Sequence, residues 1–237
     1  MDNNKINSVR SNLPEVTAAP LVRTSNGVKA IIFDLGNVLI DFNHMSAAKR
    51  ISAFTTKSPQ EVFNLFFDSG LTGIFEEGKI SPEEFFSNVK ELLNLKLDYA
   101  GFLPVWNEIF FLTEKNQAVY NLAKTLKSHY KLALLSNINI LHFDYLKKNF
   151  THLFGAFHNI ITSFELGFRK PHPLIYKKAL DILGVKPQEA FYTDDRPELV
   201  SAARQLGTRS FIFKGIEQLK KDLLDSGISI DFVPLDC

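Results

Sequence analysis

The chain has 237 residues, of which 45% are hydrophobic and 22% are charged. These proportions are ordinary for a folded globular protein and exclude an intrinsically disordered chain. The 27 basic and 26 acidic residues leave a net charge of +1. Because that balance provides no basic field for a phosphate backbone, we expect no nucleic-acid partner. No apolar run approaches the roughly 18 residues of a membrane-spanning helix, so we expect no membrane partner either.

The two ends of the chain carry few signals. The first 27 residues are polar, contain Pro14 and Pro20, and lack the continuous apolar stretch of a secretory signal. We expect a flexible N-terminal arm over residues 1–27. The single cysteine, Cys237, excludes an internal disulfide and a multi-cysteine metal site. It agrees with a reducing compartment, and we expect a cytoplasmic protein.

Short apolar runs and amphipathic segments alternate along most of the chain. Four runs have the composition of strands buried on both faces, at 28–34, 131–136, 189–194 and 209–213, with a weaker fifth at 159–162. Segments with helical apolar spacing lie between them at 118–126, 175–183 and 199–206. This alternation predicts an α/β fold, with a parallel sheet and helices on both of its faces.

Residues 43–113 interrupt the alternation. Helical segments are expected near 45–54, 59–67, 82–93 and 99–111, and Ser81-Pro-Glu-Glu84 has the residues of a helix N-terminus. Phenylalanines are concentrated here and are expected to pack a small core of their own, among them Phe63, Phe66, Phe67, Phe75, Phe85 and Phe86. We therefore expect a helical cap over 43–113, inserted into a catalytic core formed by 28–42 and 114–237.

Polar residues end three of the predicted strands. Asp34, Ser136 and Asp194 each close an apolar run. In open α/β sheets ligands bind beyond the carboxyl ends of the strands, so these three side chains are expected to share one crevice.

Four segments resemble, in order, the four motifs of the haloacid dehalogenase-like hydrolase superfamily. They are Ile31-Ile-Phe-Asp-Leu-Gly-Asn-Val-Leu39, Leu134-Leu-Ser-Asn137, Gly167-Phe-Arg-Lys-Pro-His-Pro173 and Phe191-Tyr-Thr-Asp-Asp195. The resemblance implies a Rossmann-like core with a cap. It also implies an Mg²⁺-dependent phosphatase that hydrolyses a small-molecule phosphate ester, with sugar phosphates as one candidate class, through an aspartyl phosphate on Asp34.

The resemblance also implies roles for individual residues. Asp34 is the expected nucleophile, because an attacking carboxylate divides one difficult displacement into two easier ones. Lys170 and Ser136 are expected to be catalytic and, together with Asn137 and Gly36, to contact the phosphate.

The expected Mg²⁺ ligands are Asp34, the Gly36 carbonyl, Asp194 and Asp195, since this ion prefers a shell of oxygens. Asp195 is expected in an outer shell. For one of the two adjacent aspartates, an N-cap role for the following helix is an alternative interpretation.

Two positions depart from the superfamily pattern. Gly36 stands where related phosphatases carry the aspartate that protonates the leaving group, and Asp41, His44, His172 or a cap residue are the candidate replacements. Leu199 stands where an asparagine usually tethers the metal loop.

The glycine, together with Ser136-Asn-Ile-Asn139 and Phe75-Glu-Glu-Gly-Lys-Ile-Ser81, most resembles the subgroup of bacterial α-D-glucose-1-phosphate phosphatases. The phosphatase domain of soluble epoxide hydrolases is a more distant resemblance. We hypothesise that a good leaving group compensates for the missing acid.

Two other functions remain open from the sequence. A metal-independent 2-haloacid dehalogenase would use the same aspartate to attack carbon. A non-catalytic phosphate-binding or regulatory protein would retain the fold without turnover. Mg²⁺ dependence and repeated turnover are the observations that separate these functions from a phosphatase.

Overall fold

The computed structural model describes residues 27–68 and 70–230 of the chain. Apart from Gly27, the predicted N-terminal arm lies outside these residues, as does Cys237. Within the described part of the chain, no helix is both long and apolar enough to cross a bilayer.

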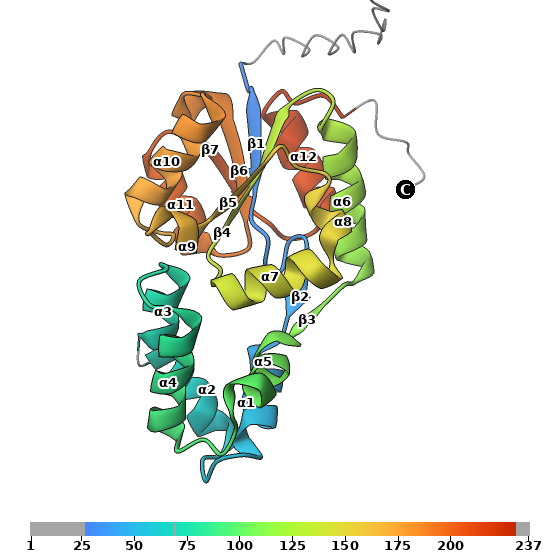
Figure 1. The fold of residues 1–237 in the computed structure, drawn as a ribbon. Helices are drawn as coiled ribbons and strands as arrows, with labels where there is room; N and C mark the ends of the chain where they lie inside the picture. Colours follow the sequence, from blue (N-terminus) through green and yellow to red (C-terminus); the bar gives the residue numbers. More distant parts are fainter. Residues whose placement is uncertain (1–26, 69, 231–237) are drawn as a thin grey trace, which may run out of the picture.

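A five-stranded parallel sheet forms the centre of the core (Figure 1). Its order is β5-β4-β1-β6-β7. The strands are β1 (Ala30–Phe33), β4 (Lys131–Ser136), β5 (Asn159–Thr162), β6 (Ala190–Asp194) and β7 (Arg209–Ile212). Every pairing between neighbours is parallel. The predicted parallel α/β sheet is therefore confirmed.

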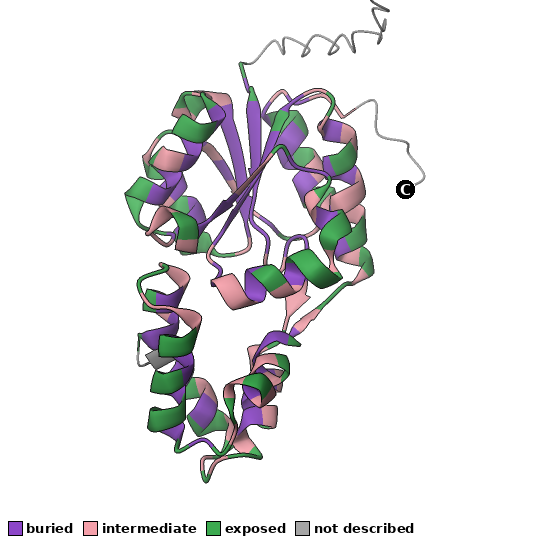
Figure 2. Cartoon of the chain, viewed as in Figure 1, coloured by how far each residue is buried: buried purple, intermediate pink, exposed green. Residues whose placement is uncertain are grey.

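Helices cover both faces of this sheet. One face carries α6 (Glu114–Leu126), α8 (Thr151–Phe154) and α12 (Ile216–Asp225), and the other carries α9 (Ser163–Leu166), α10 (Pro173–Leu183) and α11 (Pro197–Gln205). Alternate residues of β1 serve the two layers: Ile31 and Phe33 join the cluster with α6, while Ile32 joins the cluster with α10. Figure 2 shows the central strands largely buried, and all residues of β1 and β6 are buried. The remaining core elements are α7 (Ile140–Asn149) and the 3-10 turn η1 (Pro187–Glu189).

The carboxyl end of β1 lies at a reversal of strand order. From β1 the chain continues to β4 and β5 on one side, and it later enters β6 and β7 on the other. Phe33 is in register with Leu134 and Thr193, and the Asp34 amide donates to the Thr193 carbonyl at 2.9 Å. Such a reversal opens a crevice beyond the strand ends. Asp34 therefore leaves the sheet between the ends of β4 and β6.

Five helices lie between β2 and β3 in the described chain: α1 (His44–Ser52), α2 (Pro59–Asp68), α3 (Leu71–Glu76), α4 (Pro82–Leu93) and α5 (Tyr99–Asn107). They pack around a separate aromatic cluster, in which the rings of Phe75 and Phe85 stack with centroids 4.2 Å apart. Ser81 begins α4 with a capping box that includes Glu84. We refer to these helices as the cap.

The expected helix over residues 99–111 is too long by one turn. It ends at Asn107, and Phe110–Phe111 instead forms β3, which pairs antiparallel with β2 (Asp41–Phe42). Glu108 leaves the helical conformation at ψ 54°, and the Asn43 amide donates to the Ile109 carbonyl at 2.9 Å. Pairing with a strand about 70 residues away thus overrides the local helical pattern.

This two-stranded connection is anchored on the start of α6. The Asp41 carboxylate accepts from Lys115 Nζ at 2.6 Å and from Asn116 Nδ2 at 3.1 Å. These contacts with Lys115 and Asn116 outweigh partial burial and lower the pKa of Asp41. Asn116, fully buried, also donates to the Val38 carbonyl at 3.2 Å. The cap is therefore attached to the core through an ionised, hydrogen-bonded joint.

A buried histidine lies where α5 packs on α7. The His142 ring stacks on Trp106 at 4.9 Å between centroids, and its Nε2 lies 3.2 Å from the Trp106 carbonyl. Its Nδ1 is 3.1 Å from Asn139 Nδ2, which fits a neutral ring that donates from Nε2. Burial lowers the pKa of His142 to about 3 and the pKa of nearby His44 to about 4.

These two histidines predict a loss of stability in acid. Because both stay neutral in the folded chain while unfolded histidines bind protons near pH 6.5, the free energy of unfolding decreases as pH falls below about 6.5. Between pH 7.5 and 5.5 we expect a decrease of about 1 kcal/mol for each histidine. Urea unfolding at both pH values measures it, and His142→Gln should reduce the pH dependence. The exposed His152→Gln is the control, and an unchanged pH dependence in His142→Gln would contradict the assignment.

Candidate active site

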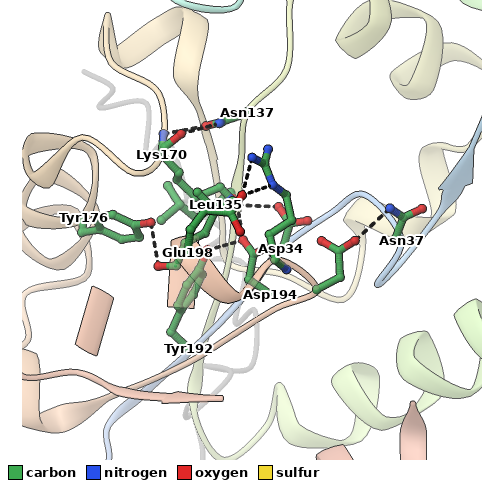
Figure 3. A network of polar contacts seen from close by, with 12 residues as sticks. Asp34, Asn37, Leu135, Asn137, Lys170, Tyr176, Tyr192, Asp194 and Glu198 are labelled. Atoms are coloured by element: carbon green, nitrogen blue, oxygen red, sulfur yellow. Dashed lines mark hydrogen bonds and ion pairs between the residues drawn. The ribbon is translucent and has the colours of Figure 1, made fainter. Parts of the chain in front are cut away.

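One buried lysine connects the strand ends (Figure 3). Lys170 Nζ lies 2.6 Å from Asp34 Oδ1 and 2.7 Å from Asp194 Oδ2, and it donates to the Leu135 carbonyl at 2.8 Å. The Lys170 side chain is only 1% exposed. A single ammonium group thus joins groups at the carboxyl ends of β1, β6 and β4.

Asn137 holds the lysine in place through its backbone. The Asn137 side chain donates to the Lys170 carbonyl at 2.8 Å and accepts from the Lys170 amide at 2.7 Å. Both polar groups of this amide are therefore used by the lysine loop, so the side chain positions Lys170.

The pKa values of the two carboxylates that contact Lys170 shift in opposite directions. Burial raises the pKa of Asp34 to about 7, although Lys170 opposes the shift. Burial also acts to raise the pKa of Asp194, but the Lys170 charge and the Tyr192 hydroxyl outweigh this effect, so the pKa of Asp194 is lowered. The Tyr192 hydroxyl donates to Asp194 Oδ2, and the Arg196 amide donates to Oδ1 at 3.0 Å. Asp194 is thus held as an anion, whereas Asp34 titrates near neutrality.

Asp195 is held from the opposite side of the site by Asn37. Asn37 Nδ2 donates to Asp195 Oδ2 at 2.9 Å, across 158 residues of sequence. Asn37 adopts the left-handed conformation with φ 56°, which asparagine tolerates better than most residues. Burial raises the pKa of Asp195, and the bond from Asn37 opposes that rise. The turn after Asp34 thereby supports Asp195 in the loop that follows β6.

The residues present suit a divalent cation. Asp34, Asp194 and Asp195 each place a carboxylate oxygen so that all three oxygens lie within 4.8 Å of one another. Asp34 and Asp194 are buried, and Lys170 is the cation paired with both. Because buried carboxylates in excess of their cations are costly, the cluster favours a bound cation with oxygen ligands.

Ser136 completes the crevice at the end of β4. It is 5% exposed, and its hydroxyl has no hydrogen-bond partner among residues 27–68 and 70–230. Such a hydroxyl, at the end of the strand whose Leu135 carbonyl accepts from Lys170, can donate to a ligand oxygen.

Comparisons with known proteins agree with this geometry. A family model of haloacid dehalogenase-like hydrolases matches residues 28–207. The chain belongs to this family. It is 24% identical to D-ribitol-5-phosphate phosphatase of Bacteroides thetaiotaomicron, over 78% of this chain and 91% of the relative. It is 29% identical to glyceraldehyde 3-phosphate phosphatase of Pyrococcus furiosus, over 83% and 85% of the two chains.

A solved structure is similar as well. It is a HAD-family enzyme of Bacteroides thetaiotaomicron in complex with magnesium and inorganic phosphate. The TM-score is 0.69 at 26% identity, covering 79% of this chain and 95% of that chain. The Rossmann-like fold expected for a haloacid dehalogenase-like hydrolase is thereby confirmed.

The Phe42 side chain packs closely against Gly36 in this hydrolase. A Cβ added at Gly36 would lie 2.6 Å from Cε1 of Phe42, which belongs to β2. The Phe42 ring therefore fills the space that a side chain at position 36 would enter. Gly36→Asp alone, which would test the leaving-group hypothesis, requires Phe42 to move.

Three of the candidate replacement acids have features that disfavour proton donation. Asp41 is an ionised anchor of the cap, and the lowered pKa of His44 keeps that ring neutral. His172 caps α10, with its Nδ1 accepting from the Leu174 amide at 3.3 Å. Among cap residues, burial raises the pKa of Glu76, which forms an ion pair with Arg169.

Leu199 has a different role from the tethering amide that it replaces. It is buried, and its carbonyl accepts from the Tyr176 hydroxyl at 2.9 Å. Asn37 supplies a side-chain amide to the metal loop from another part of the fold. The alternative N-cap role of the aspartates is wrong, because the cap residue of α11 is Arg196.

Sequence reasoning missed Tyr192 and the clamping role of Asn137. Tyr192 precedes Asp194 by two residues in a strand, so the alternation of side chains placed both on one face of the sheet. That signal was present in the sequence. For Asn137, no local pattern indicated a contact with Lys170, 33 residues away.

Removing the lysine charge should expose the cost of the buried carboxylates. In the absence of divalent cations we expect Lys170→Met to lower the free energy of unfolding by about 3–5 kcal/mol at pH 7.5. The loss should be smaller at pH 5, where protonation of the carboxylates removes their repulsion. Urea unfolding measures both.

Lys29→Met is the matched control, because it breaks an exposed ion pair with Glu189. We expect a change within about 0.5 kcal/mol for this variant. Equal losses in the two variants would contradict the bridging role of Lys170.

Proposed function

We propose that this hydrolase is a magnesium-dependent phosphatase that hydrolyses small phosphate monoesters through an aspartyl phosphate on Asp34. The observation that carries the proposal is the Lys170 ammonium group between Asp34 and Asp194, 2.6 Å and 2.7 Å away. It places a cation beside the nucleophile at the strand ends, where an anionic phosphoryl group would need one. The names of the phosphatase relatives support the same chemistry.

In the first step the Asp34 carboxylate attacks phosphorus. An Oδ–P bond forms as the P–O ester bond breaks and the alcohol oxygen leaves. Lys170 neutralises charge on Asp34 and on one phosphoryl oxygen, while the Ser136 hydroxyl and the backbone N–H of Asn137 donate to the other phosphoryl oxygens. When bound, Mg²⁺ would be held by Asp34, Asp194, Asp195 and the Gly36 carbonyl, and would supply positive charge against the incoming phosphate.

In the second step water attacks phosphorus and releases inorganic phosphate, which regenerates Asp34. The departing alkoxide of the first step needs a proton, and Gly36 carries no side chain to deliver it. The Phe42 ring closes over that position. The site therefore favours esters whose leaving oxygen is a weak base, and the proton comes from solvent water.

The relatives suggest the substrate class. One is named for D-ribitol 5-phosphate and another for glyceraldehyde 3-phosphate. Both substrates are small phosphorylated polyols or sugars. We propose this class for the present enzyme, with residues 43–113 as the cap that selects the substrate over a core of 28–42 and 114–237.

A 2-haloacid dehalogenase is the second candidate, since the same carboxylate could attack carbon. The three carboxylate oxygens within 4.8 Å of one another disfavour it, because its carboxylate substrate would be repelled in the absence of a metal. A non-catalytic phosphate-binding protein is the third. It would bind phosphate without turnover.

Phosphate release from para-nitrophenyl phosphate tests the proposal. We expect turnover that requires Mg²⁺ and is lost by at least about 10³-fold in Asp34→Asn, because the amide cannot act as the nucleophile. Asp144→Asn, an exposed change on α7, is the control and should retain wild-type activity. Turnover that persists in Asp34→Asn, or that is independent of Mg²⁺, would contradict the mechanism.

Asn37 should affect the metal requirement more than the chemistry. Asn37→Gly keeps the left-handed turn but removes the amide that holds Asp195. We expect the Mg²⁺ concentration for half-maximal activity to rise about tenfold, with little change in kcat at saturating Mg²⁺.

Asn94→Gly is the matched control, because Asn94 also has a positive φ, of 47°, but lies at the end of α4 in the cap. A Mg²⁺ requirement that is equal in the two variants would contradict the supporting role of Asn37.

A further inference from the structure

The cap touches the core at a third place, besides the β2–β3 connection and the packing of α5 on α7. Residues 75–81, Phe-Glu-Glu-Gly-Lys-Ile-Ser, close α3 and begin α4, and Figure 1 shows α3 beside α9 of the core. Glu76 makes two contacts there. Its Oε2 lies 2.7 Å from Arg169 Nε, and its backbone carbonyl accepts from Ser163 Oγ at 2.6 Å.

Gly78 makes this approach possible. It has φ 65°, and a Cβ added there would lie 2.3 Å from the Phe164 carbonyl oxygen in α9. Real Cβ atoms do not approach backbone oxygens so closely, so any larger residue would push the two segments apart. The glycine of the motif thus marks a backbone-to-backbone contact between cap and core.

The core partners of this segment are neighbours of site residues. Arg169 directly precedes Lys170. Ser163 Oγ accepts from the Ile138 amide at 3.0 Å, and Ile138 directly follows Asn137. Asn137 in turn clamps the Lys170 backbone. Glu76 therefore contacts the lysine loop directly through its side chain, and it reaches the loop after Ser136 indirectly, through Ser163 of α9.

The charges around Glu76 also favour a contact between the cap and the core. The Glu76 side chain is 16% exposed, and the cations that act on it are Arg169, Arg196 and Lys170. Glu77, the next residue, instead pairs with Lys79 of the same segment at 2.6 Å. Of these two adjacent carboxylates, only Glu76 has a core residue as its ion-pair partner.

We propose that residues 75–81 are a latch through which the cap sets the position of Lys170 and of the loop after Ser136, with Glu76, Arg169 and Ser163 as positioning residues. The catalytic consequence rests on the proposed phosphatase function. A substrate whose leaving group binds the cap would favour the conformation in which residues 75–81 contact Arg169 and Ser163. That contact would in turn hold Lys170 and the loop after Ser136 in position for the reaction. Binding energy from the non-reacting part of the ester would then be expressed in kcat.

The test compares two latch variants with two matched controls. Gly78→Ala adds a methyl group against the Phe164 carbonyl. Gly184→Ala has the same backbone strain, with φ 62°, but its Cβ would meet only Lys131 Nζ at 3.9 Å. Glu76→Gln removes the charge that faces Arg169, and Glu77→Gln removes the neighbouring charge that does not.

Two quantities are measured on each folded variant, with its Tm as a check. One is kcat and KM for para-nitrophenyl phosphate. The other is the Kd of inorganic phosphate in the presence of Mg²⁺, by calorimetry. We expect Gly78→Ala and Glu76→Gln to lower kcat by about tenfold and to weaken phosphate binding by a similar factor. Both controls should stay within about twofold of wild type.

Other results would overturn the latch. A rise in KM alone would mean that the contact merely holds the cap. Latch variants equal to their controls would mean that the contact is inert. If no ester is hydrolysed but the latch variants still weaken phosphate binding, the latch stands and the proposed function fails. If wild type neither hydrolyses esters nor binds phosphate, both proposals fail.

Discussion

The active site depends on one buried positive charge. Lys170 is almost fully removed from water, and a lone ammonium group in that position would lose its proton or destabilise the fold. Asp34, Asp194 and the Leu135 carbonyl compensate by meeting it at hydrogen-bond distance. Since these groups come from three adjacent strands, the lysine also fixes how the strand ends face one another. The same charge that pairs with Asp34 and Asp194 is the one that a phosphoryl group would meet.

Where the site departs from the superfamily pattern, other parts of the fold take over. The amide absent at Leu199 is matched by Asn37, which reaches Asp195 from the turn after β1. The acid absent at Gly36 is not restored at that position, because the Phe42 ring fills its space. The loop after β6 is thus supported differently, whereas in the proposed mechanism the leaving group takes its proton from solvent. This combination is consistent with a phosphatase that relies on its substrate for a good leaving group.

Besides the packing of α5 on α7, the cap meets the core at two places with different physical character. The β2–β3 joint is an ionised hydrogen-bond network in which Asp41 and Asn116 hold the chain at the start of α6. The Glu76 contact is smaller and depends on a glycine that lets two backbones touch. The proposed latch requires that the Glu76 contact can open while the β2–β3 joint stays formed.

The sequence by itself determined the layers of the core and the location of the chemistry. Apolar runs predicted all five strands of the sheet, and the polar residues that end β1, β4 and β6 marked the crevice, because burial on two faces leaves a composition that can be read locally. The β2–β3 pair, the helix α3 and the clamp of Asn137 on Lys170 had no such local signature. Each depends on segments far apart in the chain, as Asn37 and Asp195 do across 158 residues. Only the tertiary structure decided these contacts, and with them the pKa of Asp34, because burial and the distance to Lys170 exist only once the chain has folded.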